Sequence, residues 1–222
     1  MDLHEIAELV AGNPARLRLR QAEVVSVAAD GSLTVTIAGS TTEVSGVKAL
    51  ASVCPLVGSG VWLATDGMDV IAIGTVTPVG PAYCSVRRPT DQSIADATDT
   101  AVNFTSSATV EADTHGMFDT GDPDQLTVQV PGVYLIEGYV YWPIDADGTR
   151  LLWLEVDGGI VAATRVPVTS TWYYQQVSAT VEAAAAATIE LMVRQNAGNA
   201  LNLTAVNNAP RLAATWLRPV TS

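Results

Sequence analysis

Residues 16–37 read RLRLRQAEVVSVAADGSLTVTI, and their pattern indicates two paired β-strands. Residues alternate with a period of two from Arg16 to Arg20, and the strand-like pattern continues from Glu23 to Ala28. Asp30-Gly31 is a two-residue signal that favours a hairpin turn. Leu33 to Ile37 alternates again and is predicted to return beside the first strand.

Three further segments towards the C-terminus have the same strand-like character. Residues Glu43 to Leu50 are predicted to form one strand. Val61 to Ala64 and Val70 to Gly74 are predicted to form a second hairpin across Asp66-Gly67. Five short strands within about sixty residues are typical of a small closed barrel of the OB or SH3-like kind.

The N-terminus has a different period. Leu3, Ile6, Ala7 and Val10 follow the i, i+3, i+4, i+7 spacing of a short helix over residues 2–11, which Gly12 and Pro14 end. Because so short a helix is marginal in water by itself, it must dock either on its own domain or on a neighbouring molecule.

Thr77-Pro78-Val79-Gly80-Pro81 resembles a semi-rigid linker, because it holds two prolines and a glycine. We therefore predict a first domain over residues 1–76, a linker over 77–81 and a second, strand-rich domain over 82–222. Within the second domain, five consecutive alanines occur in Val181 to Ala187. We interpret them as a corner between strands at 178–182 and 188–195, with a short helix as the competing interpretation.

Composition excludes several classes of protein. The 222 residues carry a net charge of −12, and both halves of the chain are acidic. Such a field repels phosphate backbones and anionic membrane surfaces, so we expect no nucleic-acid partner and no membrane binding. No apolar run is long enough for membrane insertion, and no secretory signal is visible. We expect the protein to stay in the cell that makes it, or to leave it as part of a larger assembly.

Residues suited to catalysis or metal binding are few. The only histidines are His4 and His115, and we expect both to be solvated surface residues. The two cysteines, Cys54 and Cys84, could form one bridge or remain two inert thiols. Zinc-ligand spacings, phosphate-binding glycine motifs and nucleophile elbows are absent from the sequence. We expect no cofactor and no catalytic residue.

Carboxylates gather in the second domain. Asp113, Asp119, Asp122 and Asp124 lie within twelve residues, and Asp145-Ala-Asp147-Gly148 resembles the start of a calcium loop. The latter lacks the bidentate glutamate of an EF-hand, although a structural calcium site remains an alternative. The simpler interpretation is that these are turn residues between strands. A glycosidase pair of acids among Asp113 to Asp124 is a further alternative.

Residues 101–136 carry a family resemblance. Ala101 to Phe104 leads to Met117-Phe118-Asp119-Thr120-Gly121 and then to Val130-Pro131-Gly132-Val133-Tyr134, the most specific motif. Residues 82–220 resemble the globular head of the complement first component and tumour necrosis factor-like superfamily, with alanines where Gly-Asp is usual before the penultimate strands. The resemblance implies a ten-stranded jelly-roll sandwich, a tight homotrimer, and a binding module rather than an enzyme.

Large aromatic residues crowd the middle of the second domain. Because tyrosine and tryptophan are favoured where one end packs and the other stays wet, we predict that many of them form the trimer interface or the surface of the knob. The alternative is that most belong to the core. The candidates are Tyr139, Tyr141, Trp153, Trp172, Tyr173 and Tyr174.

The first domain resembles the small barrel at the start of minor tail and fibre proteins of phages that infect actinobacteria. The resemblance rests on four segments, namely residues 44–47, 55–58, 61–63 and 70–74. Barrel and jelly roll together imply a virion structural protein, made in the bacterial cytoplasm, that acts as a minor tail or fibre protein. The first domain would attach to other virion proteins, with Leu3, Ile6, Leu9 and Val10 as the docking residues.

In this hypothesis the second domain is an exposed trimeric knob, which could bind a host surface glycan or receptor. A capsid-decorating head fibre is the nearest alternative, because the same layout serves either location. A carbohydrate-active enzyme or lectin that uses the acidic loops between Asp113 and Asp124 is the alternative from another class.

Overall fold

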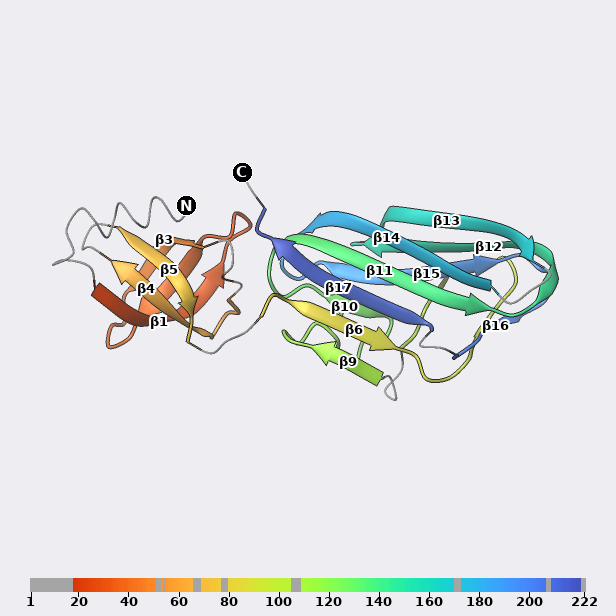
Figure 1. The fold of residues 1–222 in the computed structure, drawn as a ribbon, viewed down its shortest axis with the longest axis horizontal. Helices are drawn as coiled ribbons and strands as arrows, with labels where there is room; N and C mark the ends of the chain where they lie inside the picture. Colours follow the sequence, from red (N-terminus) through yellow and green to blue (C-terminus); the bar gives the residue numbers. More distant parts are fainter. Residues whose placement is uncertain are drawn as a thin grey trace. The chain divides into compact units, whose positions relative to one another are not determined.

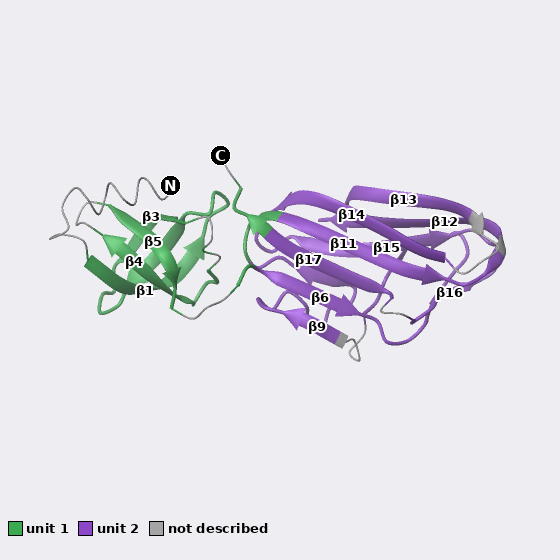
Figure 2. Cartoon of the chain, viewed as in Figure 1, with its two compact units in different colours: residues 1–81, 130–133, 217–222 green, residues 82–129, 134–216 purple. Residues whose placement is uncertain are grey.

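The fold was obtained as a computed structural model, which describes residues 18–50, 53, 55–65, 69–76, 80–104, 109–169, 173–206 and 209–220. Every regular element in these ranges is a β-strand (Figure 1). The chain divides into two compact units, coloured in Figure 2. Unit 1 comprises residues 1–81, 130–133 and 217–222, and unit 2 comprises residues 82–129 and 134–216.

Five strands of unit 1 form a closed barrel in the order β1-β2-β3-β5-β4. The alternation seen in the sequence places Val24, Leu33, Val35 and Leu63 in its core. All neighbouring pairs are antiparallel except β3 and β5, which run parallel. The barrel prediction is confirmed. Its strands are β1 (Arg18–Val27), β2 (Leu33–Ile37), β3 (Glu43–Ala49), β4 (Gly60–Thr65) and β5 (Val70–Thr75).

The outer surface of the barrel carries one residue type that occurs nowhere else in the chain. Lys48 is exposed on β3, and it is the single lysine among the 222 residues. All the other basic residues counted in the net charge are arginines.

Unit 2 is a sandwich of two five-stranded sheets. One sheet has the order β14-β11-β17-β6-β9, and the other has the order β10-β15-β12-β13 with β8 paired to β15. A separate two-stranded ribbon pairs β16 with β7. Its strands are β6 (Tyr83–Arg87), β7 (Gln92–Ile94), β8 (Thr100–Ala101), β9 (Thr109–Asp113), β10 (Gln125–Thr127), β11 (Gly132–Trp142), β12 (Asp145–Val156), β13 (Gly159–Thr169), β14 (Tyr173–Ala183), β15 (Thr188–Gln195), β16 (Leu201–Leu203) and β17 (Arg211–Arg218).

The core of unit 2 lies between the two sheets and contains large side chains. Tyr134, Trp142 and Phe104 are fully buried there. Gly138 on β11 is needed for the close approach of the sheets, because a Cβ at this position would collide with the side chain of Leu191 from β15. The all-β jelly-roll prediction is therefore confirmed, with ten strands in the two sheets and the β7-β16 ribbon as an addition.

The alanine-rich segment forms a corner, as predicted. Strand β14 ends at Ala183, a turn follows, and β15 begins at Thr188. Ala186 takes a positive φ of 66° in this turn, which a helix would not allow.

Several predictions of local structure fall on residues outside the described ranges: the helix over 2–11, with His4 in it, the turn at Asp66-Gly67 and most of the linker over 77–81. Within the described ranges, no helix has the length and apolar character needed to cross a membrane.

Candidate functional site

The outward side of the β14-β11-β17-β6-β9 sheet carries a group of tyrosines. Successive residues of a strand point to opposite faces, so Tyr134 and Trp142 on β11 fill the core while Tyr139 and Tyr141 point outward. We call this outer surface the tyrosine face. Its residues are Tyr83, Ser85, Arg87, Glu111, Tyr139, Tyr141, Tyr174 and Arg211.

Arg211 on β17 is the hub of the tyrosine face. Its Nη2 donates to the hydroxyl of Tyr83 at 3.2 Å and its Nη1 to that of Tyr139 at 3.4 Å. Its Nε donates to Ser85 Oγ at 2.8 Å and lies 3.1 Å from a carboxylate oxygen of Glu111. The guanidinium carbon is 5.9 Å from the centre of the Tyr139 ring, within the range of a cation–π contact. One side chain thus links four strands.

Arg87, Glu111 and Arg211 on the tyrosine face are paired with one another, whereas Glu137, on the same side of β11 as Tyr139, makes no ion pair with a described residue. Glu111 accepts a hydrogen bond from Ser85 Oγ at 2.9 Å and lies 3.7 Å from Arg87 Nε. Burial lowers the pKa of Arg211, but its hydrogen bond with Tyr139 and the charges of its neighbours outweigh that effect and raise the pKa overall. The guanidinium is therefore held in its charged form.

Tyr141 and Tyr174 form the second feature of the face. Their ring centres are 4.5 Å apart and the rings are inclined by 54°, a tilted aromatic pair joining β11 to β14. Tyr174 keeps 43% of its surface exposed, which makes it an accessible large side chain beside the half-buried Tyr139 and Tyr141. Apolar ring surface with hydroxyl groups at the rim suits a protein contact.

The six predicted aromatic residues do not form one site. Tyr139, Tyr141 and Tyr174 lie on the tyrosine face, and Tyr173 is half-buried at the start of β14. Trp153 belongs to the other sheet and is covered, with 6% of its surface exposed. Trp172 lies outside the described residues, as do the predicted docking residues Leu3, Ile6, Leu9 and Val10.

Sequence analysis missed Tyr83 and Arg211. Arg211 lies 72 residues from Tyr139 and 128 from Tyr83 along the chain, so no local pattern connects them. The strand that Arg211 begins offers no alternation either, because Leu212, Ala213 and Ala214 after it are all buried.

The outward side of the other sheet has a different character. Glu155 on β12 and Glu190 on β15 are direct cross-strand partners and carry the same charge. Trp153 donates its indole N–H to Glu155 at 2.6 Å. Desolvation, then the charges of Glu155 and Asp124, raise the pKa of Glu190. We call this surface the carboxylate face, defined by Glu155 and Glu190.

Acids of the 113–124 loop stabilise backbone turns. Asp113 accepts hydrogen bonds from the N–H groups of His115, Met117 and Phe118 at 2.9 to 3.2 Å. Asp119 accepts one from Gly121 N–H at 2.9 Å. These contacts favour the turn interpretation over a pair of catalytic acids. The prediction that both histidines are solvated is wrong for His115, which is buried with its Nδ1 2.8 Å from Thr114 Oγ1.

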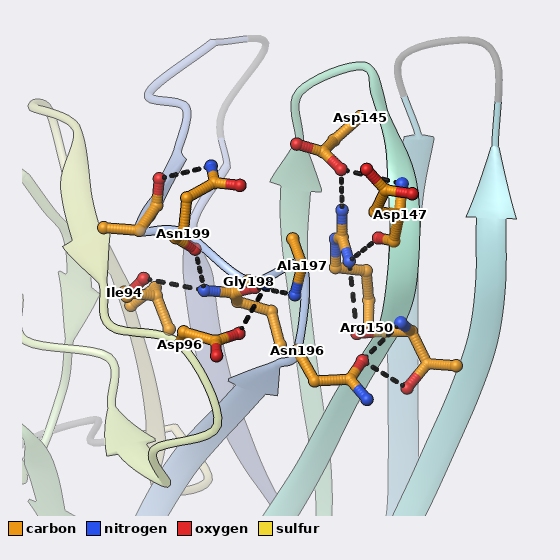
Figure 3. Close-up of polar contacts among 12 residues, drawn as sticks. Ile94, Asp96, Asp145, Asp147, Arg150, Asn196, Ala197, Gly198 and Asn199 are labelled. Atoms are coloured by element: carbon orange, nitrogen blue, oxygen red, sulfur yellow. Dashed lines mark hydrogen bonds and ion pairs between the residues drawn. The ribbon is translucent and has the colours of Figure 1, made fainter.

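One end of the sandwich is fixed by polar contacts, shown in Figure 3. Asp145 lies 3.4 Å from Nη2 of the buried Arg150, whose Nη1 donates to the Asp147 carbonyl at 2.9 Å. Asn196 accepts from Thr149 N–H at 2.6 Å, which ties the start of β12 to the segment after β15. Asp145 is therefore engaged with an arginine rather than arranged as a calcium ligand.

Cys84, which lies in the described part of the chain, does not offer an activated thiol. Cys84 is a buried free thiol, and burial, followed by the charge of Asp113, raises its pKa. Cys54 lies outside the described residues. No cluster of three or more potential metal-ligating side chains occurs among the described residues.

Comparisons with known proteins add a fold likeness only. No protein-family model matches the chain, and no curated protein matches it in sequence. The solved structure of murine APRIL is similar over 62% of this chain and 99% of its own, with 13% identity and a TM-score of 0.48. Eiger TNF from S. frugiperda is similar over 64% of this chain and 96% of its own, with 14% identity and a TM-score of 0.44. The jelly-roll assignment rests on the strand order and pairing given above.

Proposed function

We propose that this chain is a non-enzymatic binding and assembly protein whose second unit associates with two further copies of itself through the tyrosine face. The observation that carries the proposal is the accessible group of Tyr139, Tyr141 and Tyr174 on one sheet surface, organised by Arg211. Tyrosine and arginine are enriched in the centres of protein interfaces, whereas lysine is depleted there. The whole second unit lacks lysine.

Electrostatics of the face also support a contact between copies. The whole chain carries −12, so an unpaired acidic surface would repel a second copy. On the tyrosine face, Glu111 is offset by Arg87 and Arg211. Such a locally balanced patch reduces the repulsion that association must overcome. The number three comes from the family resemblance of residues 82–220.

The oligomeric mass of the full chain tests this proposal. Multi-angle light scattering of the parent is expected to give about three times the 23.2 kDa of one chain. Tyr141→Glu places a charge on the face, beside Tyr174, and is expected to shift the mass towards one chain, since burying an unpaired charge costs several kcal/mol. A parent that remains a single chain at every accessible concentration would contradict the proposal.

Leu19→Glu provides the matched control for that variant. Leu19 lies on β1, outside the tyrosine face, and is 60% exposed, so the same new charge stays in water. The control is expected to keep the mass of the parent. Equal dissociation of both variants would show that added negative charge, rather than the tyrosine face, determines assembly.

In the finer form of the proposal, the assembly is part of a bacteriophage particle. The first unit attaches to other virion proteins as a minor tail or fibre protein, and the second unit is the exposed binding knob for a host glycan or receptor. The resemblance of both domains supports this role. Labelling of purified particles with an antibody against the chain distinguishes tail from capsid decoration, and absence from particles argues against both.

A further inference from the structure

Glu137 lies on the outward side of β11, in line with Tyr139 and Tyr141. The burial of this strand alternates, so Ile136 and Gly138 on either side are buried, whereas Glu137 itself is half-buried. Within the described part of the chain, its carboxylate makes no hydrogen bond and no ion pair. A partly desolvated carboxylate without a cation is unfavourable, because it has lost contacts with water and gained no partner.

An excess of positive charge lies elsewhere on the same sheet surface. Arg87 on β6 and Arg211 on β17 share one acidic partner, Glu111 on β9, at 3.7 Å and 3.1 Å. These three side chains together carry one net positive charge. Arg211 is committed to its own copy by hydrogen bonds to three hydroxyl groups. The side chain of Arg87 is 29% exposed, so a second molecule can reach it.

The order of the strands keeps these opposite charges apart within one copy. In the sheet β14-β11-β17-β6-β9, one strand lies between β11 and β6. Since neighbouring strands are about 4.8 Å apart, the backbones of Glu137 and Arg87 are separated by about 10 Å or more. The surface therefore has a negative position on β11 and a positive position towards β6 that do not meet within one copy.

Two positions of opposite charge on one surface match the contact between neighbours in a ring. In a ring of three, each copy presents one part of its surface to the copy before it and another part to the copy after it. The β11 part of one tyrosine face then lies against the β6 part of the next. That arrangement supplies each half-buried carboxylate with a cation at every contact.

We propose that, in the assembly through the tyrosine face, Glu137 of each copy forms an ion pair with Arg87 of the next copy. This inference rests on the proposed function, because it names the charged contact of that same assembly. A pair of opposite charges in the contact fixes the alignment of the two faces, and it excludes alignments that bring like charges together.

Exchange of the two charges tests this inference on the full chain. Glu137→Arg places two arginines opposite each other, and Arg87→Glu places two glutamates opposite each other. Each variant is expected to raise the concentration at which the assembly dissociates by about tenfold or more. The double variant restores one pair of opposite charges at each contact and is expected to recover the mass of the parent in light scattering.

A mixture of the two single variants separates charge matching from misfolding. Glu137→Arg copies and Arg87→Glu copies are complementary in both orders, so two of the three contacts in a mixed ring hold opposite charges. We expect the mixture to assemble at a concentration at which neither variant assembles alone. Glu43→Arg is the matched control, because Glu43 is exposed on β3 of unit 1. It makes the same change of charge and is expected to keep the mass of the parent.

The outcomes for this inference and for the proposed function are distinct. A parent that remains a single chain overturns both. If the parent assembles and Glu137→Gln keeps or strengthens the assembly, the carboxylate has no cation in the contact and this inference alone is overturned. The same conclusion follows if both single variants show the circular dichroism spectrum of the parent, while neither the double variant nor the mixture assembles.

Discussion

The two outward faces of the sandwich are built on similar sheets and behave in opposite ways. On the tyrosine face, Arg211 joins Tyr83, Tyr139 and Glu111, so the charge of Glu111 has an opposite partner. On the carboxylate face, Glu155 and Glu190 lie opposite each other across adjacent strands. The first arrangement stabilises the fold, whereas the second destabilises it.

This difference shows that net charge alone does not identify an interaction surface. The chain is acidic throughout, yet Glu111 is offset by two arginines on one sheet, while Glu155 and Glu190 lie opposite each other on the other. The raised pKa of Glu190 means that its surroundings stabilise the ionised carboxylate less well than water does. Contact of Glu190 with water is therefore favoured. The carboxylate face is therefore expected to remain solvated in the assembly.

Breaking the hub of the tyrosine face gives the largest expected effect. Arg211→Met keeps the aliphatic stem but removes contacts to Tyr83, Tyr139, Ser85 and Glu111. We expect the free energy of unfolding to fall by about 2 kcal/mol, because several charge-assisted hydrogen bonds are lost together. Urea unfolding at matched protein concentration measures the change.

Arg211→Lys is the informative companion variant. It retains the positive charge but not the planar fork that reaches two hydroxyls and a carboxylate, so it should recover only part of the loss. Full recovery would mean that charge alone holds the face together. A change below about 0.5 kcal/mol in the methionine variant would contradict the hub role.

Relieving the repulsion on the carboxylate face gives a smaller effect of opposite sign. Glu190→Gln removes one of the two facing charges and is expected to stabilise the protein by about 0.5 kcal/mol at pH 7. Thermal unfolding of both proteins in the same buffer measures it. Destabilisation by the same amount would show that Glu190 makes a favourable contact in its ionised form.

The same residue predicts a pH dependence. Folding raises the pKa of Glu190 above its ordinary value of 4.5, so the folded protein binds this proton more tightly than the unfolded chain. At pH values above the raised pKa, the ionised Glu190 lowers the free energy of unfolding by its full amount. As the pH falls through the raised pKa towards 4.5, this destabilisation is relieved and the protein becomes more stable. The difference in unfolding free energy between parent and Glu190→Gln should therefore shrink on acidification. A difference that grows on acidification would contradict the assignment.

The smallest effect is expected from the ion pair beside the carboxylate face. Arg194 and Asp99 are 3.0 Å apart, but their side chains are 43% and 56% exposed. Arg194→Ala is expected to change the free energy of unfolding by less than about 0.5 kcal/mol, since water screens such pairs. If Arg194→Ala lowered the free energy of unfolding as much as Arg211→Met does, the distinction between the tyrosine face and the carboxylate face would not hold.

Local pattern accounts for much of the fold. Period-two alternation predicted the barrel strands, and Asp30-Gly31 predicted the turn between β1 and β2. The alanine corner was predicted because the strands on both sides of it were recognisable. The turn and the corner join segments that are neighbours in sequence, and alternation is a property of a single strand. Both can therefore be predicted from the sequence.

The candidate sites depend on contacts that a sequence does not state. Arg211 meets Tyr83 because β17 pairs with β6, and that pairing joins segments 128 residues apart. His115 is buried because the loop folds back around Asp113. Each depends on which strands become neighbours, which periodicity leaves open.

The position of Lys48 determines which chemistry can report on assembly. Lys48 is the single lysine, so the one side-chain amine of the chain lies on the barrel. Amine-reactive cross-linkers therefore cannot join two copies through side chains of the second unit, however tightly these associate. The same lysine gives one defined side-chain position for a dye or a surface tether, which leaves the tyrosine face chemically untouched.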